Sequence, residues 1–88
     1  MTPSPAAIRQ LRNVLADLYP DKPSATRVAE DAGLPIVTIA VSDRAVDNWH
    51  AIIREAQKQG RLAALLHVVG EEYGGNQALA AAIRGVEV

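Results

Sequence analysis

Few residues of this chain could do chemistry. The sequence has no cysteine, which excludes a thiol nucleophile, a disulfide and a thiolate metal site. His50 and His67 are the only candidates for a general base near neutral pH, and neither lies near a Gly-x-Ser-x-Gly motif. Ser4, Ser24 and Ser42 each stand where a helix is expected to begin, so helix capping explains them better than catalysis. We therefore predict no catalytic residues and no enzyme activity.

A metal site is also not expected. His67 and Glu71 are four residues apart and would share one face of a helix, a spacing that a metal can use. Two ligands do not make a site, and a partly exposed surface pair is the usual meaning of this spacing. We predict neither a metal nor another cofactor.

Charged side chains on helix surfaces are the remaining candidates for function. The chain has 9 Lys and Arg against 10 Asp and Glu, which gives a net charge of −1. Taken singly, each of these charged residues is most simply interpreted as part of a solvent-exposed helix face. Taken together, separate basic and acidic patches let a near-neutral domain bind copies of itself head to tail, with charge setting the choice of partner. The candidate partner-binding residues are Arg9, Arg12, Asp17, Glu30, Asp31, Arg54, Glu55 and Lys58.

The composition fits one small all-α domain. The chain has 88 residues, 49% of them hydrophobic, which is enough for a single core. It has no apolar run near the ~20 residues of a membrane span and no secretion signal at its start. The absence of cysteine is compatible with a reducing cytosol. We expect a cytoplasmic protein that binds neither membrane nor nucleic acid.

Apolar spacing predicts five clear helices. They run from about residues 6 to 18, 24 to 32, 43 to 59, 61 to 73 and 77 to 84. Ser4, Ser42 and Asn76 are placed to cap three of them, while Gly33 and Gly60 are placed to end two. Short connections predict that successive helices pack antiparallel. Residues 1–5 are expected to be a disordered lead-in, residues 6–84 the domain, and residues 85–88 a tail or linker.

The same spacing predicts the core. Trp49, the only tryptophan, lies on an apolar stripe, which favours a core role over an interface role. The residues expected to be buried are Ile8, Leu11, Leu15, Leu18, Val28, Ala29, Ala32, Val46, Trp49, Ile53, Ala56, Leu62, Leu65, Leu66, Val69, Tyr73, Leu79 and Ile83.

The segment from Leu34 to Val41 has no clear pattern. Its β-branched residues favour a strand, but the chain offers no second strand to pair with it. We interpret it as a short helical turn or an extended apolar connector.

One ordered set of residues forms a recognisable pattern along the chain: residues 15–20 (LADLYP), 29–34 (AEDAGL), Trp49, 52–56 (IIREA), 59–62 (QGRL), Leu65-Leu66, Tyr73, Asn76 and Leu79. This pattern resembles the effector-associated domain, type 1, a bacterial member of the death-like domain group. The resemblance spans about Leu11 to Ile83, although Gly74-Gly75 stands where family members tend to have a proline.

The resemblance implies a six-helix antiparallel death-like bundle whose third helix is short or irregular. It also implies an adaptor in a bacterial conflict or immunity system. By homotypic contact, such a domain would bring a sensor together with an effector such as a protease, a TIR domain or an NTPase.

Two other functions remain open. Ala29, Gly33 and Ile39 are spaced as in a helix-turn-helix, but no Lys or Arg lies between Leu34 and Asp43 to contact DNA. A structural dimerisation module would instead present an apolar, self-matching surface.

Overall fold

The computed structural model describes residues 4–35 and 44–87, and in these residues it is all-helical. The five helices are α1 (Pro5–Leu18), α2 (Lys22–Asp31), α3 (Ala45–Lys58), α4 (Leu62–Glu72) and α5 (Gln77–Glu87). The predicted all-α bundle and its five clear helices are therefore confirmed. Most of the segment expected to hold a sixth helix, residues 36–41, lies outside the described residues, so the six-helix count stays a prediction.

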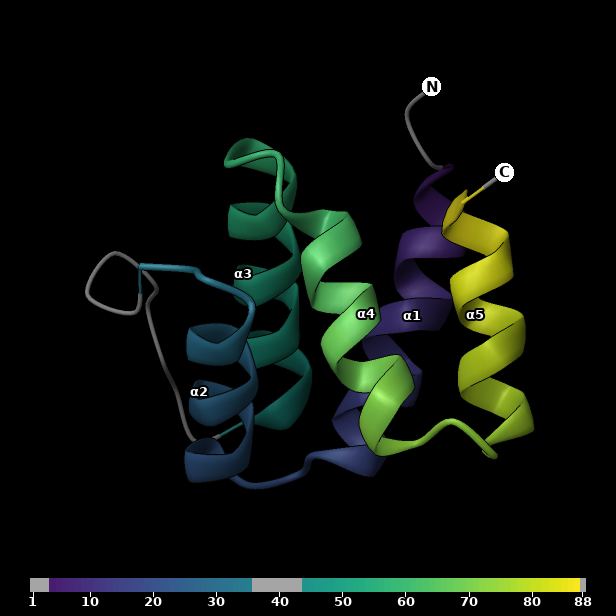
Figure 1. The fold of residues 1–88 in the computed structure, drawn as a ribbon, viewed down its shortest axis with the longest axis horizontal. Coiled ribbons are helices and arrows are strands. Elements are labelled where there is room, and N and C mark those ends of the chain that lie inside the picture. Colours follow the sequence, from purple (N-terminus) through teal and green to yellow (C-terminus); the bar gives the residue numbers. More distant parts are fainter. Residues whose placement is uncertain (1–3, 36–43, 88) are drawn as a thin grey trace.

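The helices pack around one core. Helix α1 contacts α3 and α5, α2 contacts α3 and α4, and α4 contacts both α3 and α5. Figure 1 shows that α3, α4 and α5 alternate in direction, as the short connections predict. Helices α2 and α3 instead run in the same direction, so the antiparallel prediction was wrong for this pair, which the longer connection of residues 32–44 joins. The start of α1 lies beside the end of α5, because a Cβ added at Gly85 would be 3.8 Å from the Cβ of Ala7. Within the described residues, no helix is long and apolar enough to cross a membrane.

Trp49 is the centre of the core. Its side chain is 0% exposed, and its Nε1 donates a hydrogen bond to the backbone oxygen of Tyr19 at 3.1 Å. The Tyr19 ring lies 5.5 Å from the Trp49 ring and meets the Tyr73 ring edge-on at 5.3 Å. The predicted core role of Trp49 is confirmed, while the burial of Tyr19 and Asn48 was not predicted. The other fully buried large side chains are Leu11, Leu15, Ile53, Leu65, Leu79, Val28 and Val69.

Two residues that the apolar spacing assigned to the core are exposed. Val46 is 42% exposed and Tyr73 is 36% exposed. Val46 lies in the first turn of α3 and Tyr73 caps the end of α4. The pattern was wrong at these positions because the end of a helix projects past the neighbours that cover its middle. Ile8, Leu18, Leu62 and Ile83 are half-buried and pack against the core.

The predicted start of α2 was also wrong. The helix begins at Lys22, not near Ser24, and its N-cap is Asp21. Asp21 Oδ2 accepts from the Ser24 hydroxyl at 2.8 Å and from the Ser24 backbone N–H at 3.1 Å. These bonds, the side-chain one first, lower the pKa of Asp21. Pro23 fits this first turn because no N–H is needed there.

The other helix ends test the remaining predictions. Ser4 Oγ accepts from Ala7 N at 3.2 Å and Asn76 Oδ1 accepts from Leu79 N at 2.9 Å, so both predicted caps are confirmed. Gly33 and Gly60 end their helices with φ of 81° and 69°. The N-cap of α3 is Arg44, with no side-chain capping bond, so the prediction that Ser42 holds that position was wrong. Ser42 itself lies outside the described residues.

Helix α5 is longer than its apolar spacing suggested. It was predicted to end at Arg84 and to leave residues 85–88 as a tail, but it continues to Glu87. Val86 is buried together with Leu79 and Ala82. These residues are three and four positions apart, so the extra turn extends the apolar face that α5 presents to the core.

Candidate interaction site

The serines and histidines weighed above as catalytic or metal-binding candidates either make hydrogen bonds at helix starts or are exposed to solvent, as far as they belong to the described residues. The hydroxyls of Ser4 and Ser24 make the helix-start contacts described above. His50 is exposed. His67 Nε2 lies 3.1 Å from Glu71 Oε1, with the two side chains 73% and 71% exposed, as expected for a solvated surface pair. The described residues contain no group of three or more side chains able to hold a metal ion.

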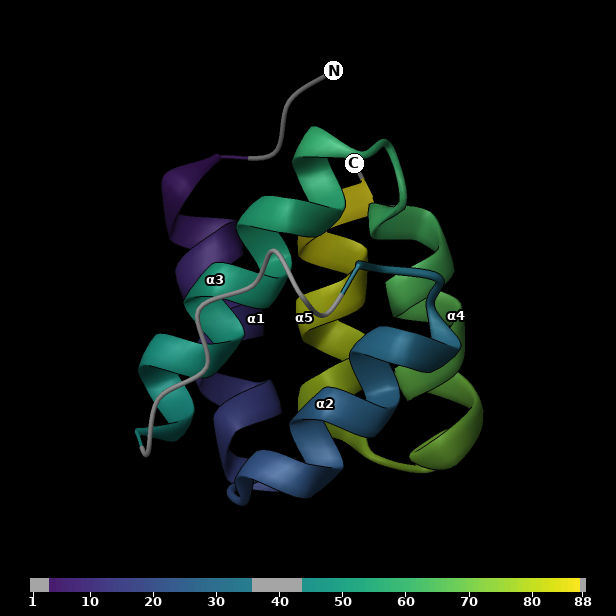
Figure 2. The same cartoon turned by 90° about the vertical axis from the view of Figure 1, so that its left-hand side faces the viewer.

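The basic candidates lie on α1 and α3. Arg9, Arg54 and Lys58 are exposed, and Arg12 is half-buried with its guanidinium 3.3 Å from Asn13 Oδ1. Arg9 belongs to the N-terminal half of α1 and Arg12 lies just past its midpoint, whereas Arg54 and Lys58 belong to the C-terminal half of α3. Figures 1 and 2 place the N-terminal half of α1 and the C-terminal half of α3 toward the same end of the bundle. Three of the four predicted cations therefore lie in helix halves that share one end.

Two of the predicted acidic residues do not join a larger group. Asp17 is exposed near the opposite end of α1 from Arg9. Glu55 is half-buried, and its Oε2 accepts from Gln59 Nε2 at 2.7 Å. Both remain candidates only as isolated surface charges.

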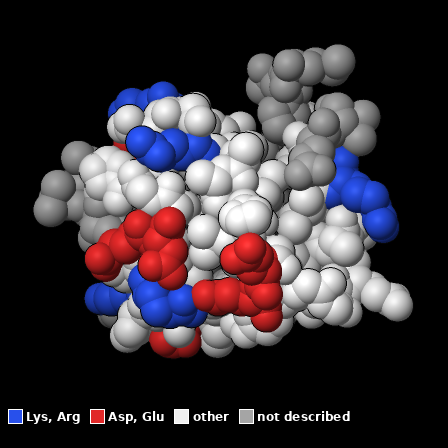
Figure 3. All heavy atoms as spheres, viewed as in Figure 1, with Lys and Arg blue, Asp and Glu red and all other residues white. Residues whose placement is uncertain are grey.

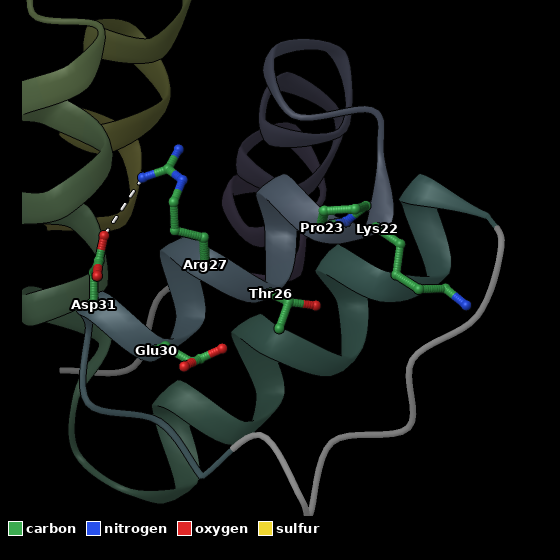
Figure 4. Close-up of a pocket in the computed structure, with 6 residues that line it drawn as sticks. All are labelled: Lys22, Pro23, Thr26, Arg27, Glu30 and Asp31. Carbon is green, nitrogen blue, oxygen red and sulfur yellow. Dashed lines mark hydrogen bonds and ion pairs between the residues drawn. The ribbon is translucent and has the colours of Figure 1, made fainter.

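The acidic pair Glu30 and Asp31 lies at the end of α2, beside a hollow. The hollow has a volume of about 400 Å³ and runs along one side of the helix (Figure 4). Its lining forms two neighbouring rows at four-residue spacing. The first row is Lys22, Thr26 and Glu30, and the second is Pro23, Arg27 and Asp31.

A polar cluster that the sequence did not reveal ties α2 to α4. Arg27 binds Glu72 through two contacts, Nη1 to Oε2 at 2.6 Å and Nη2 to Oε1 at 3.1 Å. Tyr19 donates its hydroxyl to Glu72 Oε1 at 2.7 Å. Arg27 Nη1 also lies 3.4 Å from Asp31 Oδ2. Arg27 and Glu72 are 45 residues apart, so no local spacing could have indicated this contact.

The cluster shifts the pKa values of its members. Hydrogen bonds from Arg27 and then Tyr19 lower the pKa of Glu72. Burial raises the pKa of the Tyr19 hydroxyl, and its bond to the Glu72 carboxylate raises it further. The Glu72 carboxylate therefore stays ionised at neutral pH and holds two helices and the Tyr19 ring together.

Replacing Glu72 with glutamine should destabilise the domain at pH 7 and flatten its response to acid. The folded-state pKa of Glu72 is lowered, so its stabilising effect is present above the unfolded value of about 4.3. That effect is lost as the pH falls through the folded pKa. Thermal unfolding followed between pH 7 and pH 3 should show the wild type melting a few degrees higher at pH 7, with the difference shrinking in acid.

Glu71→Gln is the matched control for this prediction. Glu71 neighbours Glu72 but is 71% exposed and contacts only His67 among the described side chains. Exposed pairs contribute about 0–1 kcal/mol, so this variant should melt close to the wild type. An equal decrease in melting temperature in both variants would mean that the Arg27–Glu72–Tyr19 cluster stabilises the domain no more than an exposed ion pair does.

Charges are unevenly spread over the face shown in Figure 3. Acidic and basic side chains gather over α2 and the C-terminal end of α4, and few charges cover the middle of that face. The charged residues of α2 are Lys22, Arg27, Glu30 and Asp31, and α4 ends in Glu71 and Glu72. The element that a helix-turn-helix would need as its recognition helix falls mostly at residues 36–41, outside the described residues.

Comparison with known proteins identifies a family. The sequence model of the family described as Effector-associated domain 1 matches residues 1–87, nearly the whole chain. This match confirms the resemblance seen in the sequence. No curated protein and no solved structure matches the chain.

Proposed function

The chain belongs to the effector-associated domain 1 family, and on that basis we propose that it is a non-catalytic adaptor. It binds matching effector-associated or other death-like domains, either its own copies or domains fused to effectors such as proteases, TIR domains or NTPases. This contact brings an effector to a sensor in a bacterial conflict or immunity system, in the cytoplasm.

The observation that carries this proposal is a set of exposed charges that have no partner within residues 4–35 and 44–87. Among the described residues, no carboxylate lies within ion-pair distance of Arg54 or Lys58, and no cation pairs with Glu30. Arg27 and Glu72, by contrast, already satisfy each other. Unpaired surface charges of both signs support recognition of a complementary surface, because charge complementarity selects partners and speeds their encounter.

Light scattering tests the proposal. The mass of the domain would be measured over a concentration series, alone and mixed with matching domains encoded nearby, at low and high salt. We expect complexes whose affinity falls by about tenfold or more on going from 0.1 M to 1 M salt, because the screening length falls from about 10 to 3 Å. A strict monomer that captures no matching domain at either salt would refute the adaptor role.

A further inference from the structure

We propose that the hollow on α2 receives α3 of a second copy of this chain, with Arg54 and Lys58 of one copy meeting Glu30 and Asp31 of the next. This contact rests on the proposed adaptor function and names the surfaces that carry it. It predicts a head-to-tail assembly, since the two surfaces differ.

The hollow suits a long basic side chain. Thr26 supplies uncharged atoms in its middle and Pro23 does so beside Lys22 at one end, while Glu30 and Asp31 place carboxylates at the other end (Figure 4). Arginine and lysine bury their aliphatic stems on such atoms while the charged head stays near polar groups. A basic helix face crossing α2 at this point therefore finds both a packing surface and counter-charges.

The carboxylates of the hollow have capacity for a new partner. The Glu30 carboxylate makes no hydrogen bond or ion pair within the described residues. Asp31 lies 3.4 Å from Arg27, a longer contact than the 2.6 Å between Arg27 and Glu72. The charge of Arg27 is therefore balanced mainly by Glu72. The carboxylates of Glu30 and Asp31 leave a net negative charge at their end of the hollow.

The two cations proposed to bind the hollow, Arg54 and Lys58, lie in a row on α3. Arg54 and Lys58 are four residues apart on α3, so they lie on one face of that helix, and both are exposed. Among the described residues, neither cation forms an ion pair with Glu30 or Asp31 of its own molecule. Both therefore remain available to a second copy, and a repeated contact between unlike surfaces gives a ring or a filament.

Charge reversal tests the pairing. Glu30→Arg and Arg54→Glu should each weaken self-association by about tenfold or more, because each places like charges face to face. Mixing the two variants should restore association, since Arg54 of the first meets Glu30 of the second. Glu71→Arg, at an exposed carboxylate on α4, is the matched control and should associate like the wild type. Circular dichroism and Trp49 fluorescence would establish that every variant is folded.

Cysteine cross-linking gives a second readout that leaves the charges intact. The chain has no cysteine, so Thr26→Cys and Gln57→Cys each provide a single thiol, one beside the hollow and one beside Arg54. A short bifunctional thiol reagent should link a Thr26→Cys chain to a Gln57→Cys chain more efficiently than it links either variant to itself.

The outcomes separate this inference from the adaptor function. If the wild type assembles but neither reversal weakens it, or if mixing restores nothing, the pairing is wrong and the adaptor role stands. If the wild type captures matching domains without self-association, the second copy is the wrong occupant and the adaptor role again stands. A wild type that does neither overturns both. Low-salt binding of a DNA duplex that Arg54→Glu abolishes and Glu30→Arg does not would assign the basic face to nucleic acid instead.

Discussion

Replacing Trp49 with alanine should remove about 3–5 kcal/mol from the free energy of unfolding. The Trp49 side chain is fully buried, packs against Tyr19 and donates a hydrogen bond through Nε1. The alanine variant loses both the ring contact and this hydrogen bond. Domains of this size have a total stability near the low end of about 5–15 kcal/mol. The variant should therefore be largely unfolded at moderate temperature. Urea titration followed by far-UV circular dichroism measures the change.

Val46→Ala is the matched control on the same helix. Apolar spacing places Val46 and Trp49 on one stripe of α3, but Val46 is 42% exposed. Its replacement should change the unfolding free energy by no more than about 0.5 kcal/mol. A large loss from Val46→Ala, comparable to that from Trp49→Ala, would show that the first turn of α3 is packed differently in solution.

The second large effect is expected at Gly33. This residue ends α2 with φ of +81°, a conformation that costs a residue with a Cβ about 1–2 kcal/mol. A Cβ there would also lie 3.1 Å from Nη1 of Arg61, so the guanidinium would have to shift by a few tenths of an ångström from its place at the end of α2. The cation is well placed at that end, because the C-terminus of a helix attracts positive charge. Gly33→Ala should therefore lose more than the conformational cost alone.

Gly60→Ala separates the two causes. Gly60 has a φ of +69°, similar to that of Gly33, but nothing lies within 4 Å of an added Cβ. This variant should show only the conformational cost, and the excess cost of Gly33→Ala should vanish when Arg61 is also replaced by alanine. Urea unfolding of the single and double variants gives the comparison. If Gly60→Ala is as costly as Gly33→Ala, the Arg61 contact contributes nothing.

Local patterns identified most of the fold. The spacing of apolar residues gave the five helices, and Ser4, Asn76, Gly33 and Gly60 marked four of their ends. The pattern failed where two local signals compete. Pro23 can break a helix or start one, and the structure shows that Asp21 starts α2 ahead of it. Arg84 and Gly85 looked like an end, but the burial of Val86 extends α5 past them.

The sequence by itself determined the all-α class, the helix faces and the buried position of Trp49, because each depends on residues within one or two helical turns. Only the tertiary structure decided that Tyr19 is buried, that Arg27 pairs with Glu72, and that Arg54 and Lys58 form no ion pair with Glu30 or Asp31 among the described residues. These depend on which helix faces pack together, and residues 45 positions apart in the chain carry no local signal of their contact. The same packing leaves Arg54, Lys58 and the Glu30 carboxylate without an ion pair among the described residues, and so available to a partner.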